Sequence, residues 1–310
     1  QVSMNLTDIM QTPIHKAFDE CVKSAYTRGM RVTGSELIGL IPLQSMLDAG
    51  KYFLEKQQRS TGVSEDELIK IAVKSMGLDE LSPFNPKERI IEYLLRDASA
   101  AKLTAMTLTA FANETASESP APGGGSISAY VGALGVSLAT MVANLSSHKP
   151  GWDSRWKEFS DWAEKGQKLK DELLKLVDED TAAFNKIMSA FTLPKGTEEE
   201  KKQRKQAIQD ATKYAIEVPF KVMQHSFESM TVIEQMAIIG NPNSVTDAGV
   251  GALCARTAVY GAFLNVQINA SGLDDKSYAA QKIEEGQKLL TNAIALEAKI
   301  LAIVQEKIKV

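Results

Sequence analysis

The fold of this chain is decided by residues 156–191, WKEFSDWAEKGQKLKDELLKLVDEDTAAFNKIMSAF. Apolar residues recur there every three or four positions, which is the spacing of one face of an α-helix. The pattern predicts a long amphipathic helix over 154–192 whose apolar face packs into a helical core. The members of that face are Trp162, Gly166, Leu169, Leu173, Leu176, Phe184, Ile187 and Phe191.

One charged residue, Asp180, falls on this apolar face between Leu176 and Phe184. A carboxylate in a core is costly unless it is paired, protonated or turned toward a cleft. Burial also raises its pKa toward the range useful for proton transfer. Asp178 and Glu179 project from other faces, where solvent can reach them. Asp180 is therefore a candidate acid/base group, and the alternatives are a buried aspartate satisfied by backbone or hydroxyl donors, or a kinked helix.

The helical pattern extends from about residue 98 to the C-terminus. Helices are expected at 98–112, 126–146, 154–192, 198–230, 231–239, 247–270 and 275–308, with bends or breaks at Pro194, Pro219 and Pro242. The uncharged run 127–145 is long enough to span a bilayer. Its polar residues and weak flanking charge favour a buried core helix and no membrane span. The expected fold class is mainly α, a helical bundle over 98–310.

Residues 1–97 show a mixed pattern. Strands are expected at 2–6 and 31–41, and helices at 13–28, 43–57, 64–76 and 88–95. Ser64, followed three residues later by Glu67, is a capping-box signal. Two strands are too few for a complete sheet, so we expect a partial α+β subdomain, a piece of a domain that precedes the bundle.

Composition excludes several classes of protein. The net charge of -4 argues against a nucleic-acid partner, because such proteins usually carry a basic balance. Cys21 and Cys254 form no CxxC motif and the three histidines are scattered, so neither a disulfide framework nor a metal site is expected. Two lone thiols are typical of a reducing, cytoplasmic setting. The chain opens at Gln1 and not at methionine, which indicates processing or excision from a longer protein.

Two loops precede helices that have functional character. The first, PAPGGGS at 120–126, lets a ligand or another chain approach its backbone, and a helix N-terminus favours negative charge. Ser126 is the expected N-cap, no Walker lysine follows, and a tight turn between packed helices is the alternative. The second, GNPNSVTDA at 240–248, ends in Thr246 or Asp247 as a helix cap. The helix after it is rich in small residues, which suit close helix packing or a subunit seam.

Other polar residues leave their roles open. Asn265 and Asn269 lie one turn apart in an apolar run and can bind a ligand or form hydrogen bonds in the core. A cationic group follows the helix at 126–146. It can meet a carboxylate tail or form a solvated surface loop, and it consists of His148, Lys149, Arg155 and Lys157.

Several motifs together resemble a known family. PAPGGGS, LVDEDTAAF (176–184), LPKGTEEEK (193–201), IEVP (216–219), GNPNSVTDAG (240–249) and YGAFLNVQIN (260–269) occur in the order found in formimidoyltetrahydrofolate cyclodeaminase. In the first section, QVSMNLTD (1–8), GSELIGLIPLQSMLDA (34–49) and LDELSPFNPKERIIEYL (78–94) resemble the C-terminal part of the glutamate formimidoyltransferase domain. The resemblance divides the chain into a transferase fragment, 1–97, and a cyclodeaminase domain, 98–310.

The resemblance implies a reaction and its residues. The enzyme would convert 5-formimidoyltetrahydrofolate to 5,10-methenyltetrahydrofolate and ammonia in histidine degradation, with no metal and no cofactor beyond the tetrahydrofolate carrier. The family's catalytic aspartate corresponds to Asp180, and the loop Gly123, Gly124, Gly125 and Ser126 would line the folate site. Lys149 and Arg155 are further substrate-binding candidates, since a polyglutamate tail is anionic and would need positive charge near the pocket. Asp247 is a further substrate-binding candidate. The transferase's catalytic histidine has no counterpart here, so transferase activity is not expected.

Two alternatives stay open. A methenyltetrahydrofolate cyclohydrolase needs the same single acid/base group beside a folate, although the transferase fragment favours the cyclodeaminase. A non-catalytic module that binds folate or joins subunits is the other. The family also implies a homo-oligomer built from dimers, and a transferase domain as partner.

Overall fold

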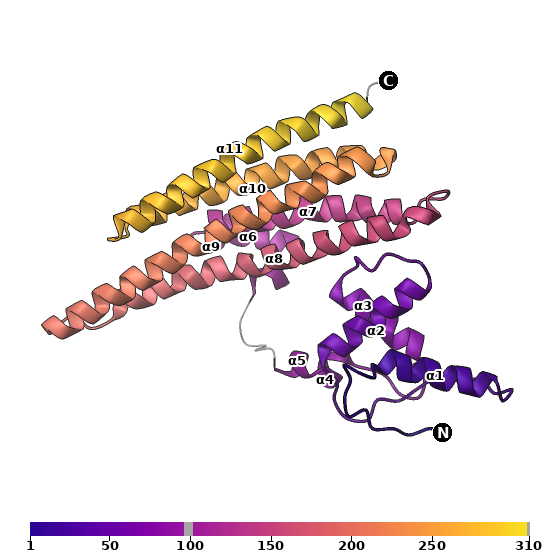
Figure 1. Ribbon diagram of the computed structural model, residues 1–310. Helices are drawn as coiled ribbons and strands as arrows, with labels where there is room; N and C mark the ends of the chain where they lie inside the picture. The colour runs from indigo at the N-terminus through magenta and orange to yellow at the C-terminus, as the bar shows by residue number, and fades with distance from the viewer. Residues whose placement is uncertain (96–101, 309–310) are drawn as a thin grey trace.

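The computed structural model describes residues 1–95 and 102–308 (Figure 1). Its regular structure there is helical, which confirms the mainly-α fold. The first section contains α1 (Ile14–Tyr26), α2 (Leu43–Lys56), α3 (Glu65–Met76), α4 (Pro86–Arg89) and α5 (Ile91–Leu94). The second contains α6 (Leu108–Thr115), α7 (Gly124–Ser147), α8 (Trp156–Thr192), α9 (Glu198–Ile239), α10 (Val245–Ser271) and α11 (Lys276–Lys307), with 3-10 turns η1 (Leu103–Ala105), η2 (Asp153–Arg155) and η3 (Pro242–Ser244).

The long helices α7 to α11 lie alongside one another as a bundle (Figure 1). Helix α9 packs against α7, α8, α10 and α11, so it forms the centre of the core. Completely buried side chains include Val136, Leu173, Ile216, Met223 and Ile233. Each such residue contributes about 1.5–3 kcal/mol through removal of its apolar surface from water. The bundle is therefore stabilised mainly by packing along the interior faces that the sequence pattern predicted.

Helix α9 is continuous where two helices were expected. It runs through position 230 and contains Pro219 in its interior. A proline there cannot donate to the carbonyl four residues earlier, which is that of Ala215. The side chain of Asn269 on α10 donates to this carbonyl instead, with an Nδ2–O distance of 2.7 Å. A hydrogen bond from another helix thus satisfies the acceptor that Pro219 leaves free, and α9 continues through Pro219 without a break.

The strands expected at 2–6 and 31–41 do not form. The described residues of the first section contain one isolated parallel bridge, between Ile41 and Ile90, and no ladder. A strand is stable only when its N–H and C=O groups pair with a neighbouring strand, and neither segment has such a neighbour. The helices α2 and α3 instead enclose a small core of their own, which includes Met46, Phe53 and Ile69.

The first section contacts the bundle through the loop before α3. Its Gly62 carbonyl accepts hydrogen bonds from Asn144 Nδ2 at 2.9 Å and from Gln167 Nε2 at 3.2 Å. The Thr61 N–H donates to Ser160 Oγ at 3.0 Å. The boundary between two domains at residue 97 lies in the segment 96–101, outside the described residues, and it stays a prediction.

Among the described residues, α7 is the one helix that is long and apolar enough to cross a membrane. In its most apolar window, 61% of the residues are buried inside the protein. The buried residues of α7 are mostly small, and because they are small, α8, α9 and α10 can all pack closely against it. The burial supports the prediction of a core helix.

Candidate functional site

The glycine-rich loop leads directly into α7, which begins at Gly124, two residues before the expected start at 126. The N-cap is Gly123, and Ser126 lies inside the first turn, so the prediction of Ser126 as the N-cap is wrong. The cap position offers no side-chain acceptor of its own. The first N–H groups of α7 therefore need an acceptor from elsewhere in the chain.

Asp180 of α8 supplies that acceptor. It accepts a hydrogen bond from the backbone N–H of Ser126, and its Oδ2 lies 3.0 Å from Ser126 Oγ. The site is tight because a Cβ placed on Gly125 would stand 2.1 Å from Asp180 Oδ1. Glycine at 125 thus lets the carboxyl group lie directly against the helix backbone. The sequence pattern predicted the position of Asp180 on the inner face of α8, and the structure joins it to the glycine loop.

The environment of Asp180 makes its neutral form easier to reach than it is for a free aspartate. Burial raises the pKa of this carboxyl above its ordinary value, and the hydrogen bonds from Ser126 oppose the shift without cancelling it. Ser126 Oγ also lies 3.0 Å from the Val177 carbonyl. If the single hydroxyl proton of Ser126 is donated to that carbonyl, Oγ can accept a hydrogen bond from the O–H of a neutral Asp180. The hydroxyl therefore suits both protonation states of the carboxyl group, which is what a proton shuttle requires.

The two neighbouring acids have partners of their own. Asp178 accepts from the Leu103 N–H at 2.7 Å and from Thr104 Oγ1 at 2.8 Å, so it fixes the segment before α6. Glu179 accepts from Tyr214 Oη at 2.9 Å. Burial and this carboxylate raise the pKa of Tyr214 to about 12. Both acids were expected to be solvated, and the structure instead gives them roles that hold α6 and α9 around α8.

The segment fixed by Asp178 changes the expected helix at 98–112. Its residues 98–101 lie outside the described part of the chain, and 103–105 form a 3-10 turn. The α-helix begins later, after Thr107, whose side chain accepts from the Ala110 N–H. A hydroxyl that caps a helix start in this way fixes the boundary more strongly than apolar spacing does.

Of the two asparagines, Asn265 faces the candidate site. A Cβ on Gly124 would stand 3.3 Å from Asn265 Nδ2, and this amide donates to the Gly261 carbonyl of its own helix at 2.9 Å. Asn269 serves α9, as described above. Of the two roles left open by the sequence, hydrogen bonding in the core belongs to Asn269. Asn265 stays the candidate for ligand binding, because it lies beside the glycine loop.

Asp247 lies in the first turn of α10 and is not its N-cap, which is Ser244. An acidic residue in a first turn is stabilised by the N–H groups of the helix start. The expectation that Thr246 or Asp247 caps this helix is therefore wrong, and the early helix start at Val245 follows from the preceding 3-10 turn of Pro242–Ser244. This turn lies beside the C-terminal end of α7, the end away from the glycine loop, where the Asn241 N–H donates to Ser146 Oγ at 2.8 Å.

The cationic candidates lie far from Asp180. Helix α7 has 24 residues, so Lys149 beyond its C-terminal end is about 36 Å from the glycine loop. Arg155 pairs with Glu158 at 2.8 Å, and Lys157 pairs with Asp161 at 2.6 Å. The Lys149 ammonium lies 4.0 Å from the centre of the Trp152 ring. The structure therefore brings the glycine loop and Asp180 together and leaves these cations outside that group.

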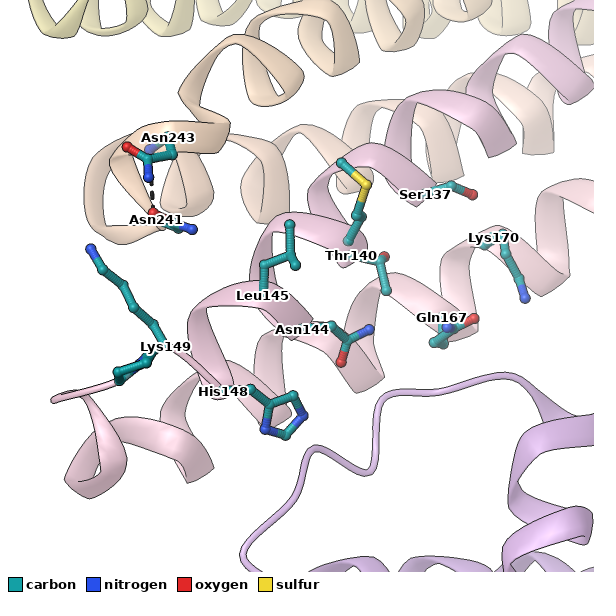
Figure 2. Close-up of a pocket in the computed structure, with 12 residues that line it drawn as sticks. Ser137, Thr140, Asn144, Leu145, His148, Lys149, Gln167, Lys170, Asn241 and Asn243 are labelled. Atoms are coloured by element: carbon teal, nitrogen blue, oxygen red, sulfur yellow. Dashed lines mark hydrogen bonds between the residues drawn. The ribbon is translucent and has the colours of Figure 1, made fainter.

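A cavity of about 730 Å³ lies at this opposite end (Figure 2). In Figure 2, Lys149 extends toward Asn241 while Asn144 and Gln167 lie together on the side of the first section. Burial, reinforced by the positive charge of Arg59, lowers the pKa of His148 at its edge. It is larger than the cavity of about 330 Å³ beside Arg59, but no carboxylate lines it and it lies away from Asp180, so its size does not identify a reaction centre.

The architecture and this site define a class of protein: a mainly-α bundle in which a carboxyl group from one long helix caps the glycine-rich start of another. No group of three His, Cys, Asp or Glu side chains that could hold a metal ion occurs among residues 1–95 and 102–308. The model for the family "Formiminotransferase-cyclodeaminase" matches residues 107–288, and that for the "Formiminotransferase domain" matches residues 1–96. The chain belongs to the formiminotransferase-cyclodeaminase family.

Similar proteins carry both of the activities considered above. The formimidoyltransferase-cyclodeaminase of Gallus gallus is 35% identical over 99% of this chain, and the chain covers 57% of its length. The methenyltetrahydrofolate cyclohydrolase of Methylorubrum extorquens is 37% identical over 65% of this chain and 97% of its own length. The formiminotetrahydrofolate cyclodeaminase of Thermotoga maritima superposes with a TM-score of 0.60 and 25% identity over 67% of this chain and all of that chain. The chain thus spans somewhat more than half the length of the bifunctional relatives.

Proposed function

We propose that this chain converts 5-formimidoyltetrahydrofolate to 5,10-methenyltetrahydrofolate and ammonia. The observation that carries the proposal is the carboxyl group of Asp180, held against Gly125 and Ser126 at the start of α7, where burial raises its pKa. In the reaction, N10 attacks the formimino carbon and ammonia leaves. One proton must leave N10 and one must reach the departing nitrogen. A single carboxyl group with a raised pKa can accept the first and donate the second.

The remaining groups of the site would position the substrate. Gly123 and Gly124 leave the helix start open for a ligand, and the free N–H groups there favour an electron-rich oxygen or ring nitrogen. Asn265 offers an amide beside Gly124. Holding N10 close to the formimino carbon lowers the barrier because the two reacting atoms no longer need to find each other. No step of this scheme requires a group beyond the tetrahydrofolate carrier.

The test is turnover by the purified chain with simultaneous detection of methenyl product and ammonia. Asp180→Asn keeps the shape and the acceptor for Ser126 but cannot exchange a proton. We expect it to lower kcat by at least about 100-fold while the helical content is unchanged. Full turnover by a folded Asp180→Asn protein would show that Asp180 is not the shuttle.

A cyclohydrolase is the second candidate because the similarity to the Methylorubrum extorquens enzyme covers nearly all of that protein. Hydrolysis of added methenyltetrahydrofolate without ammonia release from the formimino substrate would replace the first proposal by this one. Binding of folate without either reaction would favour a non-catalytic module.

We also propose partners. A homo-oligomer is supported by exposed apolar side chains on neighbouring faces of α7 and α10, among them Leu134, Leu253 and Tyr260. Sedimentation velocity would detect it, and a monomer at micromolar concentration would count against it. Lys149 and Arg155 stay alternative candidates for a polyglutamate tail. Lys149 lies about 36 Å from the glycine loop, at about 1.5 Å per residue of α7, so these cations could contact only a long tail that runs along α7 and away from the part of α8 beyond Asp180. A transferase domain partner rests on the match of residues 1–96.

A further inference from the structure

Helix α8 continues beyond the N-terminal end of α7 (Figure 1). Because Asp180 lies level with Gly125 in the first turn of α7, the residues of α8 after Asp180 have no cover from α7. Phe184, Met188 and Phe191 are consequently 37%, 50% and 49% exposed, although the sequence pattern placed Phe184 and Phe191 in the core. Their steps of three and four residues keep them on the face that carries Asp180. An open aromatic stripe thus begins one turn from the candidate acid/base group.

A guanidinium group lies at the far end of this stripe. Arg204 of α9 donates from Nε and Nη2 to the Phe191 carbonyl at 3.3 and 3.1 Å, and its Cζ is 5.6 Å from the Phe191 ring centre. Within the described part of the chain it forms no ion pair, whereas the adjacent Lys205 pairs with Asp274 at 2.8 Å. Nη1 of Arg204 is therefore free to bind a carboxylate.

The spacing of these groups fits one part of a folate. Asp180 and Phe191 are eleven residues apart, which corresponds to about 16 Å along α8, and Phe184 is about 6 Å from Asp180. Ordinary bond lengths place the glutamate carboxylates of a folate roughly 12 Å from N10, with the flat aminobenzoyl ring between them. With N10 in contact with Asp180, the ring falls beside Phe184, and the carboxylates come within reach of the Arg204 side chain.

We propose that Phe184 and Arg204 position the substrate by holding its aminobenzoyl-glutamate part, the ring against Phe184 and a carboxylate on Arg204. This inference rests on the proposed function for the choice of substrate. Aromatic rings prefer offset or edge contacts with another ring, which the exposed Phe184 can offer. An arginine already fixed by a backbone carbonyl loses little conformational freedom when it binds an anion.

The test uses p-aminobenzoylglutamate and the uncharged p-aminobenzamide as probes, with binding followed by calorimetry on the full chain. We expect Phe184→Ala to weaken both probes and Arg204→Gln to weaken only p-aminobenzoylglutamate, each by about tenfold. Arg28→Gln is the matched control. Arg28 also donates to a backbone carbonyl, that of Ser24 at 2.8 Å, but it follows α1 in the first section of the chain and not α8. Leu145→Ala, 47% exposed at the other end of α7, is the control for loss of apolar surface.

The outcomes separate this inference from the proposed reaction. Probe binding that depends on Phe184 and Arg204, in a chain without turnover, supports the inference and contradicts the reaction. In an active chain, both variants should raise KM more than they lower kcat. Three results would each overturn the inference. The first is absence of probe binding by the wild-type chain, and the second is an equal loss of probe affinity in the Arg28→Gln control. The third is unchanged probe affinity in Phe184→Ala and Arg204→Gln proteins whose oligomeric state alone has changed.

Discussion

Replacement of Gly125 by alanine tests the geometry of the site most directly. The added Cβ would stand 2.1 Å from Asp180 Oδ1, whereas ordinary contact begins at 3.4 Å, so the carboxyl group or the start of α7 must move by the difference of 1.3 Å. A displacement of about 1 Å in a catalytic group costs on the order of 100-fold in rate. Gly125 is the second residue of α7, and the rest of α7 stays packed against α8, α9 and α10, so the protein should stay folded.

The neighbouring residue provides the control. A Cβ on Gly123 would meet no atom nearer than the Pro120 carbonyl oxygen at 3.8 Å, and the backbone at Gly123 is extended. Gly123→Ala leaves the contact between Asp180 and α7 intact, so it should lose less turnover than the about 100-fold loss expected of Gly125→Ala, even though Gly123 lies in the proposed substrate site. The assay is the initial rate of methenyl formation, with circular dichroism for helical content. Equal rates for the two variants would refute the argument that close contact between Asp180 and the backbone of α7 places the reacting group.

Three further changes follow from the same contacts. Asn269→Ala should lower the free energy of unfolding by about 1–3 kcal/mol, because the buried Ala215 carbonyl loses its donor. Pro219→Ala in the same chain should restore part of that free energy, because the alanine N–H can donate to the Ala215 carbonyl. Urea denaturation of both single variants and of the double variant measures the three free energies. Ser126→Ala should raise the pKa of Asp180 further, because it removes a hydrogen bond that lowers that pKa, and should shift the corresponding limb of the pH–rate profile to higher pH. The raised pKa of Asp180 also predicts that wild-type stability falls as pH rises from the unfolded value near 3.8 through the folded value, since the folded state binds more protons there; Asp180→Asn should lack this part of the fall in urea titrations at successive pH values.

The sequence pattern predicted the bundle well because helical spacing reports directly on which residues face a core. It also identified Asp180, since one charged residue interrupted a regular apolar face. The pattern failed for Phe184 and Phe191, which share that face but extend past the end of α7. Spacing describes one helix alone, and it contains no information on where a neighbouring helix stops.

The helix boundaries show the same limit. The sequence predicted a bend or break at Pro219, but α9 continues there because Asn269, fifty residues later, satisfies the carbonyl that the proline leaves free. The strands expected in the first section failed for the opposite reason. Their local pattern was adequate, but a strand needs a partner, and the described residues provide only the bridge between Ile41 and Ile90.

The sequence by itself determined the mainly-α class, the family, and the two elements of the candidate site, because periodicity, turn residues and motifs are local properties of the chain. Only the tertiary structure decided that these elements meet, that Gly125 receives the carboxyl of Asp180, and that Lys149 lies at the other end of α7. The physical reason is that burial, and with it the pKa of Asp180, depends on which helices end beside it. Those neighbours are set by packing between segments far apart in the sequence.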